Sequence, residues 1–115
     1  MPAKLALIVR SDLGMSKGKI AAQVAHAAVA AALRNQHSAQ FAAWLRDGQP
    51  KVVLKLDGAD ALEELCAAAE AAGLPVERIR DAGRTQVAPG TLTCCAIGPA
   101  PDEEVDPAVK ELTLL

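Results

Sequence analysis

The chain has 115 residues, of which 51% are apolar and 23% charged, and its formal net charge is −2. This length predicts a single domain over residues 1–115 with a modest core, and the composition excludes a disordered or fibrous protein. The longest apolar run, residues 21–33, is too short to cross a membrane and is interrupted by Gln23 and His26, so we expect no membrane partner. The apolar run near the N-terminus covers only residues 5–9 and is unlike a secretory signal.

Strands and helices are predicted to alternate along the sequence. In chain order we predict a strand at residues 5–10, helices at 17–35 and 39–46, a strand at 51–56, a helix at 60–72, and strands at 76–80 and 91–97. Ser16 is suited to cap the first helix, which is rich in alanine and contains no proline. Residues 99–107 form either a loop or a short acidic helix, and residues 111–115 either a short strand or a packed tail.

This alternation is typical of an α/β fold whose sheet is covered by helices on both faces. The last two predicted strands have no helix between them, so one of them is expected to run antiparallel. We therefore predict a mixed four-stranded sheet in a three-layer α/β/α arrangement.

Charge is distributed unevenly along the chain. Residues 1–56 carry eight basic and two acidic side chains, whereas residues 57–115 carry four basic and twelve acidic ones. Within the acidic half, Arg78, Arg80 and Arg84 stand against Asp81 alone over residues 78–100. These segments form a cationic surface for nucleic acid if the fold brings them together, and ordinary solvated charge if it does not. With no Tyr, one Phe and one Trp, such a partner would be held by its phosphates and not by base stacking.

The cysteines do not form a disulfide framework. There are three of them, Cys94 and Cys95 are adjacent, and Cys66 falls in an alanine-rich helix where it is most simply a core residue. This usage favours a reducing cytosol, so we expect a cytoplasmic protein. The chain has no CxxC motif, and its two histidines stand at no ligand spacing from a cysteine, so we expect no metal and no cofactor.

The stretch SDLGMSKGKIAAQVAHA, residues 11–27, places Lys17 and Lys19 in the first turn of the predicted helix. Cations there are disfavoured by the helix dipole by about 0.3–1 kcal/mol each, but together with free backbone N–H groups they form an anion site. Lys19, Gln23 and His26 are expected to form one polar stripe beside an apolar stripe that faces the sheet. A solvated helix face is the alternative interpretation. A nucleotide-binding P-loop is excluded, because its glycines would be one residue too close and Ile20 replaces the required Ser or Thr.

The stretch DAGRTQVAPGT, residues 81–91, places Asp81, Arg84 and Thr85 directly after a predicted strand. This is where α/β folds bind ligands, so a carboxylate and a hydroxyl are expected in one cleft. The alternative is that these side chains cap and close turns.

Four segments appear in order along nearly the whole chain: VRSDLGMSKGKIAAQVAHAA (residues 9–28), GQPKVVLK (48–55), DAGRTQVAPGT (81–91) and IGP (97–99). Together they resemble the type 2 peptidyl-tRNA hydrolases, the archaeal and eukaryotic kind. Ser16 replaces the glycine usual in that family, and the adjacent cysteines stand in a strand that is usually aliphatic. The resemblance implies a homodimer that hydrolyses the ester joining a peptide to the terminal ribose of tRNA. The functional positions of the family that match are Lys19, Asp81 and Thr85, with Gln23, His26 and Arg84 nearby.

Under this hypothesis Asp81 orients or deprotonates the attacking water, and His26 is a rival base because of its unperturbed pKa. Lys19 stabilises the oxyanion or protonates the leaving ribose oxygen, and Thr85 positions water or substrate. A cluster of Lys17, Lys19 and Arg84 would repel the free ammonium of aminoacyl-tRNA. The side chains expected to hold the acceptor-stem phosphates are Lys51, Lys55, Arg78 and Arg80. Two alternatives remain, a non-catalytic tRNA- or protein-binding adaptor of the same fold and a small-molecule-binding regulator.

Overall fold

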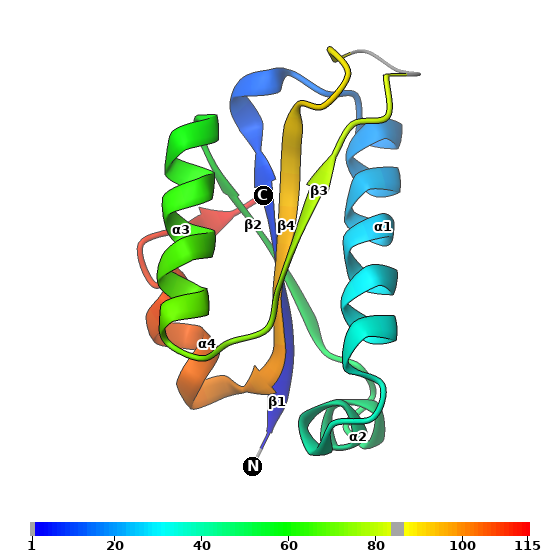
Figure 1. Cartoon of the computed structure of the whole chain (residues 1–115), viewed down its shortest axis with the longest axis vertical. Coiled ribbons are helices and arrows are strands. Elements are labelled where there is room, and N and C mark those ends of the chain that lie inside the picture. Colours follow the sequence, from blue (N-terminus) through cyan, green and yellow to red (C-terminus); the bar gives the residue numbers. More distant parts are fainter. Residues whose placement is uncertain (1, 84–86) are drawn as a thin grey trace.

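The computed structural model describes residues 2–83 and 87–115, which form a five-stranded sheet with helices on both faces (Figure 1). Arg84 and Thr85, both expected in the functional site, lie outside the described residues. In chain order the elements are β1 (Ala3–Arg10), a 3-10 turn (Ser11–Leu13), α1 (Lys17–Asn35), α2 (Ala39–Arg46), β2 (Lys51–Leu56), α3 (Ala59–Ala71), β3 (Val76–Arg80), β4 (Leu92–Pro101), α4 (Asp102–Val109) and β5 (Thr113–Leu114).

The strand order is β3-β4-β1-β2-β5. Among the described strands β1 and β2 run parallel and the other neighbours are antiparallel, so the prediction of a mixed sheet is confirmed. The predicted count of four strands is wrong. Thr113 and Leu114 pair with Lys55 and Leu54 of β2 and make the chain end a fifth strand, which was one of the two alternatives for this segment.

The last long strand extends beyond its predicted end at residue 97. It continues to Pro101 because Ala100 and Pro101 pair with Lys4 and Ala3 at the start of β1. The segment after it forms the short acidic helix α4, which begins at Asp102. The helix alternative for residues 99–107 is therefore confirmed, with a later start.

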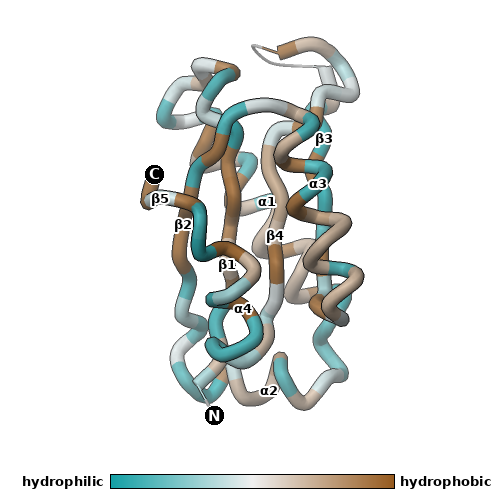
Figure 2. The backbone as a smooth tube through the Cα atoms, turned by 90° about the vertical axis from the view of Figure 1, so that its left-hand side faces the viewer, coloured by the Kyte–Doolittle hydropathy of each residue, from teal (hydrophilic) through white to brown (hydrophobic). Residues whose placement is uncertain are grey.

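The core lies on both faces of the sheet because the central strand β1 is apolar on both sides. Leu5, Leu7 and Val9 pack toward α1 and α2, whereas Ala6 and Ile8 pack toward α3 and α4. Successive residues of a strand point to opposite faces, so a strand buried on both sides becomes a continuous apolar run. Figure 2 shows this run as hydrophobic colouring along β1 and β2, while the start of α4 is hydrophilic.

Helix α1 turns an unexpected set of residues toward the sheet. Its buried residues are Lys19, Gln23, Ala27 and Ala31, whereas His26 is exposed. The prediction that Lys19, Gln23 and His26 share one polar stripe is therefore wrong for His26. A step of three residues from Gln23 to His26 rotates by about −60° around the helix axis, whereas a step of four to Ala27 rotates by about +40°, so the two side chains point about 100° apart. The buried line of α1 thus begins with two polar side chains and ends with alanines.

Candidate active site

Lys19 and Asp81 form a buried ion pair, although 62 positions separate them in the sequence. The ammonium of Lys19 donates a hydrogen bond to Oδ1 of Asp81, and the two side chains are only 6% and 1% exposed. Lys19 lies in the first turn of α1, and Asp81 directly follows β3. Both elements reach the same end of the molecule (Figure 1). The structure therefore brings together the two described residues that were predicted to be catalytic.

Ser16 fixes the start of α1 as expected. Its backbone is extended, and its side-chain oxygen accepts a hydrogen bond of 3.2 Å from the backbone N–H of Lys19. The first turn of α1 contains no acidic residue to offset the positive end of the helix dipole. The carboxylate of Asp81, which follows β3, pairs with the Lys19 side chain of this turn.

The loop after β3 holds Asp81 by its backbone and by its side chain. The backbone N–H of Asp81 donates to the carbonyl of Thr91 and its carbonyl accepts from the N–H of Gly90, both at 2.8 Å. The second carboxylate oxygen accepts a hydrogen bond of 2.7 Å from the N–H of Gly83. Gly83 has a φ of +86°, and a Cβ at this position would lie 2.8 Å from Cγ of Pro89. This position therefore requires glycine.

Gln23 and Thr93 form a second polar contact, one helical turn after Lys19. The Thr93 hydroxyl is fully buried and lies 2.5 Å from Oε1 of Gln23, and Gln23 itself is 8% exposed. The thiol of Cys94 lies 3.4 Å from the backbone carbonyl of Gln23. Thr93 is not among the residues predicted from the sequence to be functional. A single threonine in the otherwise apolar run LTCCAI was the available signal, because buried polar groups need partners.

Lys17 and His26 remain outside this buried site. Both side chains are exposed on α1, Lys17 in the first turn and His26 on the solvent side. Lys17 is therefore accessible to a large anion that approaches the helix start, and His26 is exposed about two turns further along the helix.

The residues predicted to hold phosphates do not form one surface. Arg78 faces α3, where its guanidinium forms ion pairs with Glu70 and Glu63, and these carboxylates raise its pKa. Lys51 and Lys55 are exposed and flank Val53, which packs on the α1 side, so they lie on that face of the sheet.

Lys51 also lies over the Trp44 ring, 5.3 Å from its centroid. Arg80 is exposed and donates a hydrogen bond of 3.3 Å to the carbonyl of Gly90.

The cysteines pack in the core and are fully buried. Cys94 lies on the α1 side of β4, whereas Cys95 and Cys66 lie on the α3 side. Burial raises the pKa of the Cys94 thiol to about 11. Because the thiolate is the reactive form, this side chain is suited to packing.

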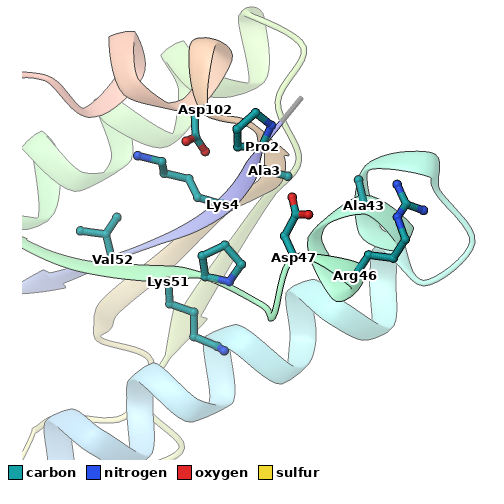
Figure 3. Close-up of a pocket in the computed structure, with 10 residues that line it drawn as sticks. Pro2, Ala3, Lys4, Ala43, Arg46, Asp47, Lys51, Val52 and Asp102 are labelled. Carbon is teal, nitrogen blue, oxygen red and sulfur yellow. The ribbon is translucent and has the colours of Figure 1, made fainter.

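A pocket of about 780 Å³ lies at the opposite end of the molecule, beside the N-terminus and α2 (Figure 3). Lys4, Arg46 and Lys51 line it together with Asp47 and Asp102. This pocket is separate from the Lys19–Asp81 pair. Over the described part of the chain, no three His, Cys, Asp or Glu side chains gather where they could hold one metal ion. None of the described helices is long and apolar enough to span a membrane.

The fold and the site define a small α/β protein in which an ammonium and a carboxylate, buried together at the end of a strand, can serve acid–base and oxyanion chemistry. A family model described as "Peptidyl-tRNA hydrolase PTH2" matches residues 3–115. The chain therefore belongs to the peptidyl-tRNA hydrolase PTH2 family, and the resemblance seen in its motifs is confirmed.

Relatives from several archaea resemble the chain over nearly its full length. A protein of Thermococcus onnurineus named peptidyl-tRNA hydrolase is 50% identical to it, and the match covers 97% of both chains. A protein of the same name from Sulfolobus acidocaldarius is 49% identical, with 97% of this chain and 99% of the relative covered. One from Sulfurisphaera tokodaii is 47% identical, with both chains covered completely.

Proposed function

We propose that the protein hydrolyses the ester bond of peptidyl-tRNA and so releases free peptide and tRNA. The observation that carries this proposal is the buried Lys19–Asp81 pair in a chain that belongs to the PTH2 family. An adaptor that only binds tRNA has no need of this pair. Burying two charges is costly unless they are paired, and a buried pair adds little stability compared with apolar residues.

In the proposed mechanism the Asp81 carboxylate orients the attacking water and accepts its proton. Hydrogen bonds from Lys19 and Gly83 fix the carboxylate at both oxygens, so its lone pairs point in defined directions. We assign this role to Asp81 and not to His26, because Asp81 is buried beside Lys19, whereas His26 is exposed about two helical turns further along α1. Thr85 is proposed to position the water or the substrate.

Lys19 is proposed to stabilise the oxyanion that forms on the ester carbonyl and to protonate the leaving ribose oxygen. An ammonium has three N–H donors, and the contact with Asp81 Oδ1 uses one of them. The remaining N–H groups can donate hydrogen bonds to the ester carbonyl oxygen as its negative charge develops. Because the side chain is 6% exposed, the interaction is screened less than it would be in water.

We also propose that exposed lysines hold the phosphates of the tRNA acceptor stem. Lys51 and Lys55 on β2 and Lys17 at the start of α1 are exposed. Arg80 is a further candidate, while Arg78 is a weaker one because Glu70 and Glu63 already pair with its guanidinium.

The same proposal includes a single domain over residues 1–115 that works as a homodimer in the cytoplasm. Val29 and Leu33, which are 57% and 62% exposed on α1, offer apolar surface for a second copy. Three free, buried cysteines are consistent with a reducing compartment.

The test is a turnover assay of purified protein with N-acetyl-aminoacyl-tRNA, run in parallel with free aminoacyl-tRNA. We expect release of the N-acetyl-amino acid and little cleavage of the free aminoacyl ester. Binding of tRNA without cleavage of either ester would refute the hydrolase and support the adaptor.

A further inference from the structure

Gln23 lies one helical turn beyond Lys19, within reach of the peptide part of a substrate whose ester is held at Lys19. Both residues belong to the buried line of α1 and both are 8% exposed. One helical turn separates them, so their backbones are about 6 Å apart along the axis. Consecutive carbonyl groups of an extended peptide are spaced by about 3.5 Å. An ester carbonyl bound at the Lys19 ammonium therefore leaves the next carbonyl of the peptide within reach of the Gln23 side chain.

The contact with Thr93 decides which end of the Gln23 amide is available. The Thr93 hydroxyl has one hydrogen and two neighbouring acceptors, Oε1 of Gln23 at 2.5 Å and the carbonyl of Ile79 at 3.3 Å. In the structure this contact runs from the hydroxyl to the amide oxygen of Gln23. Thr93 therefore donates to Gln23, and the amide oxygen is occupied.

The amide nitrogen of Gln23 is then left with two donor hydrogens. Among residues 2–83 and 87–115 the structure gives this nitrogen no hydrogen-bond partner. Thr93 is fully buried and Cys94 contacts the backbone carbonyl of Gln23, so both the side chain and the backbone of Gln23 are anchored to β4. The site thus contains a fixed hydrogen-bond donor one turn from the Lys19–Asp81 pair.

We propose that the Gln23 amide nitrogen binds the carbonyl oxygen of the acyl group on the substrate's α-nitrogen, and that Thr93 is the positioning residue that fixes this amide. This inference rests on the proposed function. The acyl carbonyl is the group that peptidyl-tRNA has and aminoacyl-tRNA lacks. In an aminoacyl ester the α-nitrogen carries no acyl group and is an ammonium. It therefore offers no acceptor to Gln23, and its positive charge lies near the Lys19 ammonium. With the wrong substrate bound, this donor would be covered without a partner, which lowers binding of that substrate.

The test compares two esters of one tRNA, N-acetyl-phenylalanyl-tRNA and phenyllactyl-tRNA. They share the ester and the side chain, neither carries an ammonium, and only the first has an acyl carbonyl. The measured quantity is the ratio of their kcat/KM values. We expect Gln23→Met, which keeps the side-chain length but removes the donor, to lower this ratio by about 10- to 100-fold. Gln40→Met is the matched control, because Gln40 is an exposed glutamine on α2, and it should leave the ratio unchanged.

Thr93→Val should lower the same ratio, because the amide is then free to turn, and Thr93→Ser should restore it. The double variant Gln23→Met/Thr93→Val should have the same ratio as Gln23→Met alone, because Thr93 acts through Gln23. Far-UV circular dichroism confirms that each variant is folded, and Gln23→Asn, which shortens the donor's reach, replaces Gln23→Met if that variant unfolds.

Two results would overturn the inference while leaving the hydrolase intact. One is a ratio that does not change in the Gln23 variants, and the other is an equal loss for both esters, as a purely structural role would give. Failure of the wild-type protein to cleave either ester would instead refute the proposed function as well.

Discussion

Replacing Lys19 by methionine tests how the structure balances its buried charges. The substitution keeps an unbranched side chain of similar length but removes the ammonium that pairs with the carboxylate of Asp81, which is 1% exposed. The N–H of Gly83 still donates a hydrogen bond of 2.7 Å to the second oxygen of this carboxylate.

The size of the effect follows from the burial of the pair. Removing one partner of a buried ion pair lowers the free energy of unfolding by about 3–5 kcal/mol. For a chain of this length that loss corresponds to a fall in Tm of about 10–20 °C. Because small domains are stable by about 5–15 kcal/mol, this loss is a large fraction of the total, and the unfolding curves are recorded from a low starting temperature.

The assay is thermal and urea unfolding of Lys19→Met beside the double variant Lys19→Met/Asp81→Asn. The double variant carries neither charge, and its asparagine still accepts from Gly83, so its unfolding free energy should return to within about 1–2 kcal/mol of the wild type. Turnover should stay low in both variants. A single variant as stable as the wild type would refute this reasoning, and so would a double variant no more stable than the single one.

Four further results are expected. Gly83→Ala should lower stability by about 1–2 kcal/mol and reduce turnover, because alanine is strained at positive φ; unchanged turnover would show that the loop conformation is not needed. Arg10 lowers the pKa of Asp12 to about 2, so this pair stabilises the fold above the unfolded pKa of about 4 and loses its effect as the pH falls to 2. Asp12→Asn should therefore flatten the dependence of Tm on pH between 5 and 2, and an unchanged slope would contradict this. Lys51→Ala and Lys55→Ala should each reduce the salt dependence of tRNA binding by nearly one unit in log–log slope, and an unaltered slope would remove them from the interface. The three cysteines should not react with a thiol reagent at pH 8 until the protein is unfolded, and rapid labelling of the native protein would show that they are accessible.

The sequence predicts best those features that local interactions determine. The bounds of α1 are confirmed because Ser16 caps the helix and alanine favours it throughout. The bounds of β2 and β3 are likewise those predicted, since each is a short run with β-branched residues that lies between Gly and Pro residues. By contrast, β5 has two residues and is a strand because it pairs with Leu54 and Lys55. The local sequence does not predict this pairing, so it left a short strand and a packed tail as alternatives.

The site shows the same division between local and long-range effects. The positions of Lys19 at a helix start and Asp81 at a strand end indicated a ligand site, and the resemblance to the type 2 peptidyl-tRNA hydrolases implied their catalytic roles. The inward orientation of Gln23 was not predicted, because its partner Thr93 lies 70 positions away. The ion pairs of Arg78 with Glu63 and Glu70 were not predicted for a similar reason. The sequence alone does not show which face of the edge strand β3 packs against α3.

The measurement that tests the central claim most directly is the single-turnover rate of N-acetyl-aminoacyl-tRNA cleavage by the wild-type protein and by Asp81→Asn. Enzyme is kept in excess at saturating concentration, so differences in tRNA affinity do not affect the rate. Loss of the carboxylate that accepts the water's proton predicts a rate at least about 10²-fold lower, with unchanged binding of tRNA. Cleavage by Asp81→Asn within a few-fold of the wild-type rate would show that the buried Lys19–Asp81 pair does not carry out the hydrolysis.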